Sequence, residues 1–256
     1  MMAKSIAVHS FKGGTGKSTI TANLAAALVG RGRRVGIMDM DLEGPGLHVI
    51  FNLDPGEVRY TLNDVLLDAA RPEQAAIDMN ERLGLNGRGQ LLFTPASIKV
   101  SEMLRTLRTG FEVQSFASAV SKLQDHFKLD YLLIDTHPGL ENDTLLVMGV
   151  CDHLLIVSRI DQQDIFGTGV MVEIAETLEK PTHLVVNMIP SGMKPSDASK
   201  LALNIGNSFK VEVMGWFPFS EDVQGSLSKS VFILTSPKHP IASRFQDLAK
   251  KVEAFS

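Results

Sequence analysis

The fold is decided by one stretch of the chain, Phe11-Lys12-Gly13-Gly14-Thr15-Gly16-Lys17-Ser18-Thr19. It follows a short apolar run and precedes a helix-forming run that continues to Gly30. Glycines let successive backbone N–H groups turn inward around phosphate oxygens, and the start of a helix adds the positive end of its dipole. Lys17 can neutralise the β- and γ-phosphates, and the Ser18 hydroxyl can reach Mg²⁺. A plain glycine-rich turn would not need Gly-Lys-Ser in register. The spacing therefore predicts a loop whose nucleotide-binding residues are Gly13, Gly14, Thr15, Gly16, Lys17, Ser18 and Thr19.

Outward from this loop, short apolar runs alternate with longer helical patterns, which is typical of a buried parallel sheet covered by helices on both faces. We expect a single α/β domain over residues 1–256, with a mostly parallel twisted sheet in three layers. The expected strands are Ser5–Ser10, Val35–Asp39, Gln90–Phe93, Tyr131–Asp135, His153–Val157, His183–Asn187 and Glu212–Phe217. The expected helices are Ser18–Gly30, Phe111–Phe127, Asp143–Val150, Asp164–Leu178, Ser196–Phe209 and Ile241–Phe255. Right-handed crossovers place the carboxyl ends of all the strands at one edge, where ligands bind in open α/β sheets.

The segment 54–128 is expected to be a variable excursion within this domain, and no residue in it can be assigned a role. Its first part, 54–89, carries Pro, Gly and mixed charge, and it predicts a surface segment with one short helix near Leu62–Leu67.

Composition excludes several classes of function. The net charge is -4, so any polyanion contact must be a local patch, and the later part of the chain is slightly richer in basic residues. Cys151 is the only cysteine, which excludes an internal disulfide and an intrachain thiolate cage for zinc or iron–sulfur. The N-terminus lacks the pattern of a signal peptide, and no uncharged stretch is long enough to span a bilayer. We therefore expect a cytoplasmic protein.

The phosphate loop departs from the usual pattern in a specific way. Phe11 stands where the first glycine of the standard loop belongs, and Lys12 follows it. This combination resembles the deviant Walker A loop of the ParA/MinD family of P-loop ATPases, of the SIMIBI class, whose form is Lys-Gly-Gly-x-Gly-Lys-[Ser/Thr]. In that family the first lysine reaches across a dimer interface to the phosphates of the partner's nucleotide. The resemblance implies this role for Lys12, whereas without it Lys12 reads as a solvated surface lysine.

Two further strand ends resemble the switch regions of the same family. By that resemblance, Asp39 supports the Mg²⁺ shell and Asp41 orients or deprotonates the attacking water, although such a pair could otherwise be solvated or cap a helix. Asp135, at the end of Tyr131–Asp135, would hold a Mg²⁺-bound water, and the Gly139 amide could sense the γ-phosphate. His137 is the unusual member: it could be a pH-sensitive part of the switch or a histidine packed in a turn.

Later segments supply the expected base-binding and partner-facing residues. By the resemblance, Asn187 hydrogen-bonds the adenine and Pro218 flanks it, whereas plain chemistry allows Asn187 to cap a helix or close a turn. The segment 159–164 could face a partner subunit or form a charged loop. The similarity covers the chain from Ser5 to about Phe255, and outside the three motifs it is one of pattern only.

The resemblance implies an enzyme that binds ATP/ADP with Mg²⁺ and hydrolyses ATP slowly as an ATP-sandwiched homodimer. In this class Lys12, Lys17 and Asp41 are the catalytic residues, Ser18, Asp39 and Asp135 serve the metal, and the dimer acts as a spatial-positioning or partitioning switch. An activating protein partner is expected. Nonspecific DNA is the first surface considered, on the basis of Lys229, Lys238, Arg244, Lys250 and Lys251, which could equally be a solvated charged face.

Other functions remain open from the sequence. One is a membrane-associated regulator, since Ile241, Phe245, Leu248, Val252 and Phe255 form an apolar stripe; we expect this helix to pack on the sheet instead. A nucleotide-binding regulator with little turnover is another. Cys151 alone disfavours a metal-cluster carrier, and Lys12 disfavours a ligase related to dethiobiotin synthetase.

Overall fold

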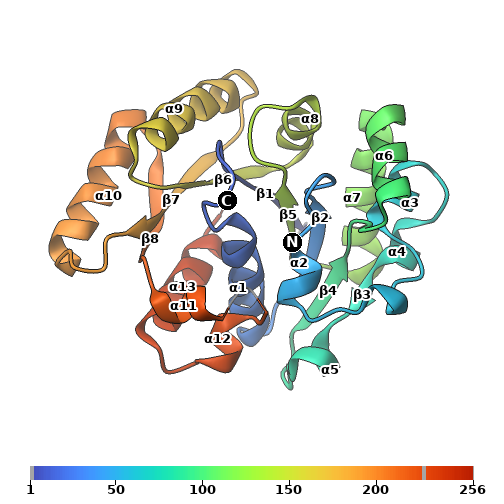
Figure 1. Ribbon diagram of the computed structural model, residues 1–256, viewed down its shortest axis with the longest axis horizontal. Coiled ribbons are helices and arrows are strands. Elements are labelled where there is room, and N and C mark those ends of the chain that lie inside the picture. Colours follow the sequence, from blue (N-terminus) through green and yellow to red (C-terminus); the bar gives the residue numbers. More distant parts are fainter. Residues whose placement is uncertain (1–2, 227–228, 256) are drawn as a thin grey trace.

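A mostly parallel sheet runs through the molecule, with strand order β3-β4-β2-β5-β1-β6-β7-β8 (Figure 1). The computed structural model describes residues 3–226 and 229–255. All neighbouring strands are parallel except β3, which pairs antiparallel with β4. The strands are β1 Lys4–His9, β2 Arg34–Met40, β3 Ile77–Asp78, β4 Gln90–Thr94, β5 Tyr131–Thr136, β6 His153–Ser158, β7 Thr182–Ile189 and β8 Glu212–Pro218.

Helices cover both faces of this sheet (Figure 1). One face carries α1 Lys17–Gly30, α2 Leu47–Ile50, α5 Asn80–Leu83, α12 Phe232–Thr235 and α13 Pro240–Val252, with α11 Glu221–Gly225 beside them. The other face carries α3 Leu62–Leu66, α4 Pro72–Ala75, α7 Val113–Phe127, α8 Asn142–Val150, α9 Gln162–Thr177 and α10 Pro195–Phe209. The outer helix α6 Val100–Thr109 and a 3₁₀ turn, Pro55–Glu57, complete the described elements.

The two faces of the sheet form two separate hydrophobic cores because side chains alternate along each strand. In β1, Ile6 and Val8 point into the core under α1, whereas Ala7 points into the core on the opposite face. Burial on both faces explains why the central strands read as continuous apolar runs.

Helix α1 begins directly at the phosphate loop. Gly16 takes the N-cap position with φ 87°, a left-handed conformation that favours glycine. The following residues, Ile20 to Val29, are all buried, because α1 lies between the sheet and α13. The N-terminus of a largely buried helix therefore lies directly at the loop.

The strand β8 forms one edge of the sheet, and side chains of α13 occupy two of its carbonyl groups. Lys251 Nζ donates to the carbonyl oxygen of Val213 (2.9 Å), and Arg244 Nη1 donates to that of Trp216 (3.2 Å). The Arg244 guanidinium also lies 3.4 Å from the centroid of the Trp216 ring. The edge is thus closed by α13, whose apolar stripe is buried against α1 and β8.

The fold class predicted from the sequence is confirmed: seven predicted strands form, within one or two residues of their expected bounds. The short helix predicted near Leu62–Leu67 is confirmed as α3. Two predictions were wrong. The segment 54–89 holds α4, α5, a 3₁₀ turn and β3 in addition to that helix, and each of them is too short for a periodic pattern to show. The last helix ends at Val252, and Phe255 stacks on the His153 and His183 rings instead of continuing it.

Candidate active site

The phosphate loop surrounds a small cavity at the carboxyl edge of the sheet. Residues Gly13 to Thr19 line it together with Ser10, Asp41, Gly46, Ile50 and Pro138, and its volume is about 260 Å³. Gly14 and Gly16 have φ values of 73° and 87°, so both need glycine. Ser10 Oγ donates to the carbonyl oxygen of Lys12 (2.8 Å) and fixes the start of the loop.

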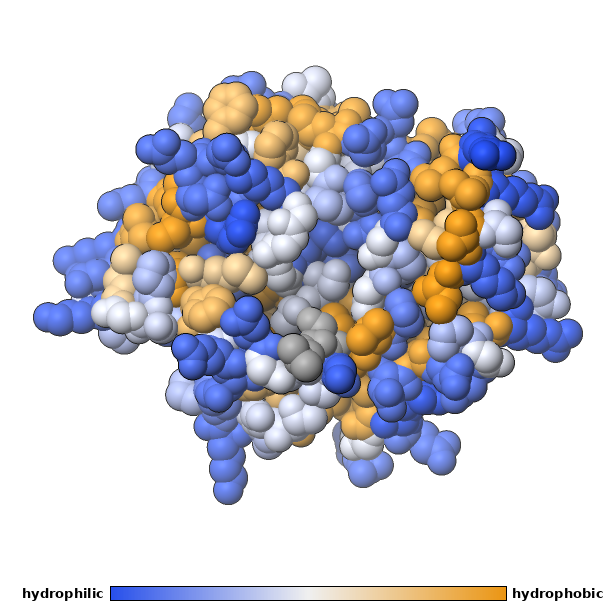
Figure 2. Space-filling view, viewed as in Figure 1, coloured by the Kyte–Doolittle hydropathy of each residue, from blue (hydrophilic) through white to orange (hydrophobic). Residues whose placement is uncertain are grey.

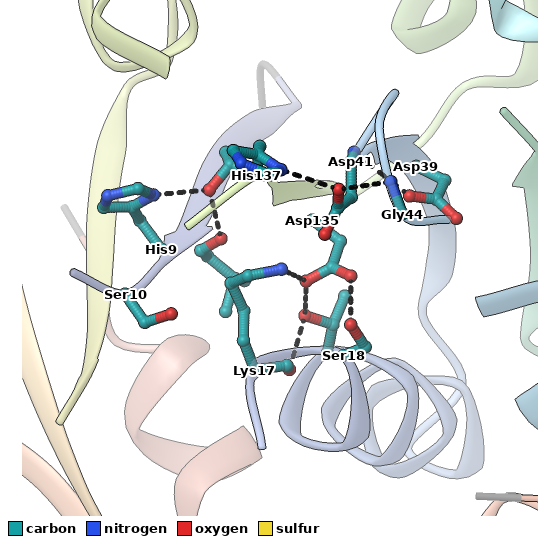
Figure 3. Close-up of polar contacts among 12 residues, drawn as sticks. His9, Ser10, Lys17, Ser18, Asp39, Asp41, Gly44, Asp135 and His137 are labelled. Carbon is teal, nitrogen blue, oxygen red and sulfur yellow. Dashed lines mark hydrogen bonds and ion pairs between the residues drawn. The ribbon is translucent and has the colours of Figure 1, made fainter. Parts of the chain in front are cut away.

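At the start of α1, Asp135 accepts from three side chains of this helix (Figure 3). Lys17 Nζ lies 3.0 Å from Asp135 Oδ1, Thr21 Oγ1 donates to the same oxygen (3.1 Å), and Ser18 Oγ donates to Oδ2 (2.6 Å). Asp135 is fully buried, so the ion pair with Lys17 compensates the loss of hydration. The structure thus brings Lys17, Ser18 and Asp135 together, as the sequence predicts.

Asp39 lies opposite Asp135 because β2 and β5 are neighbours in register. Burial, and then the Asp135 charge, raise the pKa of Asp39 well above its usual range. Its Oδ1 accepts from the backbone N–H of Asp41 (3.2 Å), whereas the buried Oδ2 has no hydrogen-bond partner among the described residues. This oxygen is therefore available as an acceptor.

Asp41 lies at the mouth of the cavity and contacts a residue of the neighbouring strand end (Figure 3). His137 Nδ1 is 2.9 Å from Asp41 Oδ1, and the backbone N–H of Gly44 donates to the same oxygen (3.0 Å). His137 thus lies in the segment directly after β5, where it contacts Asp41.

Lys12 points to the start of α9 in its own chain. Its Nζ lies 3.3 Å from Asp161 Oδ1 and 3.9 Å from Asp164 Oδ1, and it also donates to Gln163 Oε1. Arg159 Nε pairs with Asp164 Oδ2 at 2.5 Å. Lys12 therefore contacts the segment 159–164 of its own chain. The sequence alone allowed this segment to face a partner subunit or to form a charged loop.

A second, more apolar pocket adjoins the loop on its other side. Its volume is about 300 Å³, and its lining includes Gly16, Asn187, Pro218 and Phe219. Asn187 Nδ2 donates to the carbonyl oxygen of Thr15 (2.7 Å), which leaves its carbonyl oxygen as an acceptor. The structure thus places Asn187 and Pro218 together beside the loop.

Three of the five basic residues considered for DNA contact bind groups of the same chain. Arg244 and Lys251 bind carbonyl groups of β8, and Lys250 pairs with Asp247 (3.1 Å). Within residues 3–226 and 229–255, no helix is both long and apolar enough to cross a bilayer.

Several residues of the site escaped sequence reasoning. Thr21 follows Lys17 by one helical turn, a spacing that puts both on one face and could have revealed it. His9 Nδ1 donates to Thr136 Oγ1 (2.6 Å), since that hydroxyl donates in turn to the Val8 carbonyl (3.1 Å). Burial lowers the pKa of His9 to about 3, so this histidine is neutral.

Known proteins match this chain over nearly its whole length. Residues 3–188 match a family model described as an AAA domain (AAA_31). The septum site-determining protein MinD of Thermotoga maritima is 25% identical over 255 residues, covering 98% of this chain and 88% of that protein. The cell division ATPase MinD of Pyrococcus furiosus has a similar structure, with a TM-score of 0.80, 24% identity and full coverage of both chains. MinD of Pyrococcus horikoshii, solved in complex with Mg-ADP, has a TM-score of 0.82 at 22% identity and covers 99% of this chain and 97% of its own.

The loop, the two aspartate-bearing strand ends and these matches together define the class. The chain belongs to this AAA domain family and is a P-loop ATPase of the ParA/MinD type.

Proposed function

We propose that this protein binds ATP with Mg²⁺ and hydrolyses it slowly as an ATP-sandwiched homodimer. The observation that carries the proposal is the cavity lined by Gly13 to Thr19 and by Asp41, in which Lys17 is paired with the buried Asp135. The pocket beside Asn187 and Pro218 adjoins the same loop, so a nucleotide could place its phosphates in one cavity and its base in the other.

The residues that would hold Mg²⁺ are Ser18, Asp39 and Asp135. Asp39 Oδ2 has no partner among residues 3–226 and 229–255, and Asp135 lies opposite Asp39. Two buried carboxyl groups at this spacing fit a hard divalent cation, which prefers oxygen ligands. When bound, Mg²⁺ neutralises charge on the phosphate oxygens. Lys17 would then exchange Asp135 for the β- and γ-phosphates.

Asp41 is proposed to act as the base. Its Oδ2 accepts a proton from the attacking water, whose oxygen bonds to the γ-phosphorus. The bond between this phosphorus and the bridging oxygen breaks, which releases phosphate and ADP.

Lys12 is proposed to complete the site of a second copy of the chain. To do so it must leave Asp161 and Gln163, and phosphate charge on the partner's nucleotide would compensate for these contacts. In related phosphoryl transfer a cation supplied from outside the loop accelerates the reaction by about 10³- to 10⁵-fold.

The cellular role that fits such a dimer is a spatial-positioning or partitioning switch. ATP closes two subunits and hydrolysis releases them, so a surface formed only by the dimer can bind and release a partner. An activating protein and nonspecific DNA are the partners we propose, in a cytoplasmic setting, ahead of a membrane surface, since the apolar stripe of α13 is buried.

The test is the size of the protein with Mg-ATP and with Mg-ADP, measured by light scattering after gel filtration. Asp41→Ala is expected to accumulate an ATP-dependent dimer because it binds but does not hydrolyse. Lys12→Ala is expected to stay monomeric and to lose turnover by about 10³-fold. Equal behaviour of the two variants would contradict their separate roles. A wild-type protein with no affinity for ATP in magnesium buffer would overturn the whole proposal.

A further inference from the structure

The contact between His137 and Asp41 joins the two switch segments beside the cavity (Figure 3). Its geometry defines the position of one proton. An ionised carboxylate can only accept a hydrogen bond, so the 2.9 Å contact requires the proton to lie on His137 Nδ1. The side chains of His137 and Asp41 are 27% and 15% exposed, so water competes for this contact only in part.

This hydrogen bond makes the two oxygens of Asp41 different. Oδ1 accepts from both His137 Nδ1 and the backbone N–H of Gly44. Oδ2 accepts no hydrogen bond from any residue between 3 and 226 or between 229 and 255. Two donors on one oxygen set the rotation of the carboxylate and leave the other oxygen free to accept a proton.

His137 is itself held in place from several sides. It follows the last residue of β5, and Thr144 Oγ1 of α8 donates to its carbonyl oxygen (3.4 Å). Its Nε2 faces Glu43 Oε2 at 3.8 Å. A loop aspartate alone would rotate about its own side-chain bonds, whereas a strand end and a helix fix the ring that orients Asp41.

We infer that His137 is the positioning residue for Asp41, holding Oδ1 so that Oδ2 faces the attacking water. The inference rests on the proposed role of Asp41 as the base. His137 reaches the reacting atoms only through Asp41, so its loss affects the chemical step and leaves nucleotide binding intact. The effect expected from a hydrogen bond to a charged group is a fall in kcat of about 10- to 100-fold.

The experiment measures single-turnover ATP hydrolysis and the affinity for a fluorescent ATP analogue separately. His137→Ala is expected to lower kcat by about 10- to 100-fold and to change the Kd by less than about twofold. His137→Asn is expected to recover most of the rate, because the asparagine amide can place a donor near the position of Nδ1. The exposed His126, on α7, supplies the control: His126→Ala is expected to hydrolyse at the wild-type rate.

A cycle with Asp41→Asn separates positioning from a general structural role. In that background His137→Ala is expected to cause no further loss, since the residue it orients is gone. An additive loss, a wild-type rate for His137→Ala, or failure of His137→Asn to recover activity in a folded protein would each overturn the inference. A wild-type protein that binds ATP without hydrolysing it would instead overturn the proposed enzymatic function.

Discussion

Asp39 and Asp135 lie opposite each other in adjacent strands, and both are buried. Lys17 pairs with Asp135, whereas Asp39 Oδ2 has no hydrogen-bond partner in the described part of the chain. The pKa of Asp39 is raised by burial and by Asp135, so the ionised form is disfavoured in the folded protein. Asp39 therefore lowers the free energy of unfolding at neutral pH. Such a cost is expected of residues whose role is functional rather than structural.

Asp39→Asn is expected to raise the free energy of unfolding of the nucleotide-free protein by about 1–2 kcal/mol, because it removes a carboxyl group whose ionisation is disfavoured by burial and by Asp135. The same change is expected to reduce the thermal stabilisation that Mg-ATP provides. Calorimetry with and without Mg-ATP checks both effects. A lower melting temperature without nucleotide would contradict the account of Asp39 as a strained carboxylate.

Much of the site could be predicted at the residue scale, whereas one contact could not. Gly13 to Thr19 are consecutive, so their placement follows from the loop alone. His137 and Asp41 are 96 positions apart, and their contact depends on β2 lying beside β5. Once Asp39 is known to lie opposite Asp135, the equal two-residue spacing to Asp41 and His137 puts them opposite as well. That strand order is what the sequence does not reveal.

At the scale of elements, α9 supports the phosphate loop through a glycine. A Cβ added to Gly167 would lie 2.1 Å from the Phe11 ring. The Phe11 side chain therefore packs directly against the backbone of Gly167, where no larger residue fits. Phe11 replaces a glycine of the standard loop, and Gly167 provides the space for it.

Gly167→Ala is expected to displace Phe11 and to weaken ATP binding by about tenfold, with a loss of stability of about 1–3 kcal/mol from overpacking. Adding Phe11→Ala is expected to restore part of both losses, since the two side chains compete for one space. Isothermal titration with ATP and urea unfolding measure them. Strictly additive effects in the double variant would show that the contact does not link α9 to the loop.

The helix α6 shows why elements of the excursion were not predicted. Its apolar residues Val100, Leu104 and Leu107 are exposed, and Figure 2 shows apolar surface over this helix, whereas Thr106 is its buried residue. Apolar residues at helical spacing normally mark the buried face of a helix, but in α6 they lie on the exposed face. The large helices and central strands were predictable because burial and periodicity agree in them.

At the scale of the whole molecule, the described C-terminal residues are tied to the opposite edge of the sheet from the active site. The Phe255 ring stacks on His183 and His153 at centroid distances of 4.1 and 4.4 Å, at the starts of β7 and β6. Burial lowers the pKa of His183 to about 4 and also lowers that of His153. Both rings are therefore neutral at pH 7.

This arrangement predicts an acid-sensitive fold. Below a pH of about 6.5 the unfolded chain takes up protons on these histidines, whereas folded His183 does so only near pH 4. The free energy of unfolding is thus constant above about pH 6.5 with respect to His183, and it decreases as the pH falls from about 6.5 to about 4. Solvent screening of this partly exposed ring reduces the size of the decrease to about 1–2 kcal/mol. Urea unfolding at several pH values measures it. His183→Gln is expected to flatten this decrease, and an unchanged profile would exclude His183 as its source.

The closed edge at β8 has a consequence for the way copies of this chain can meet. An edge strand with unpaired N–H and C=O groups can pair with a strand of another copy, and repeated pairing produces fibrils. Lys251 and Arg244 occupy two carbonyl groups of this edge with cations, and the other edge of the sheet is the two-residue strand β3. Addition of further strands is therefore disfavoured at both edges of the sheet.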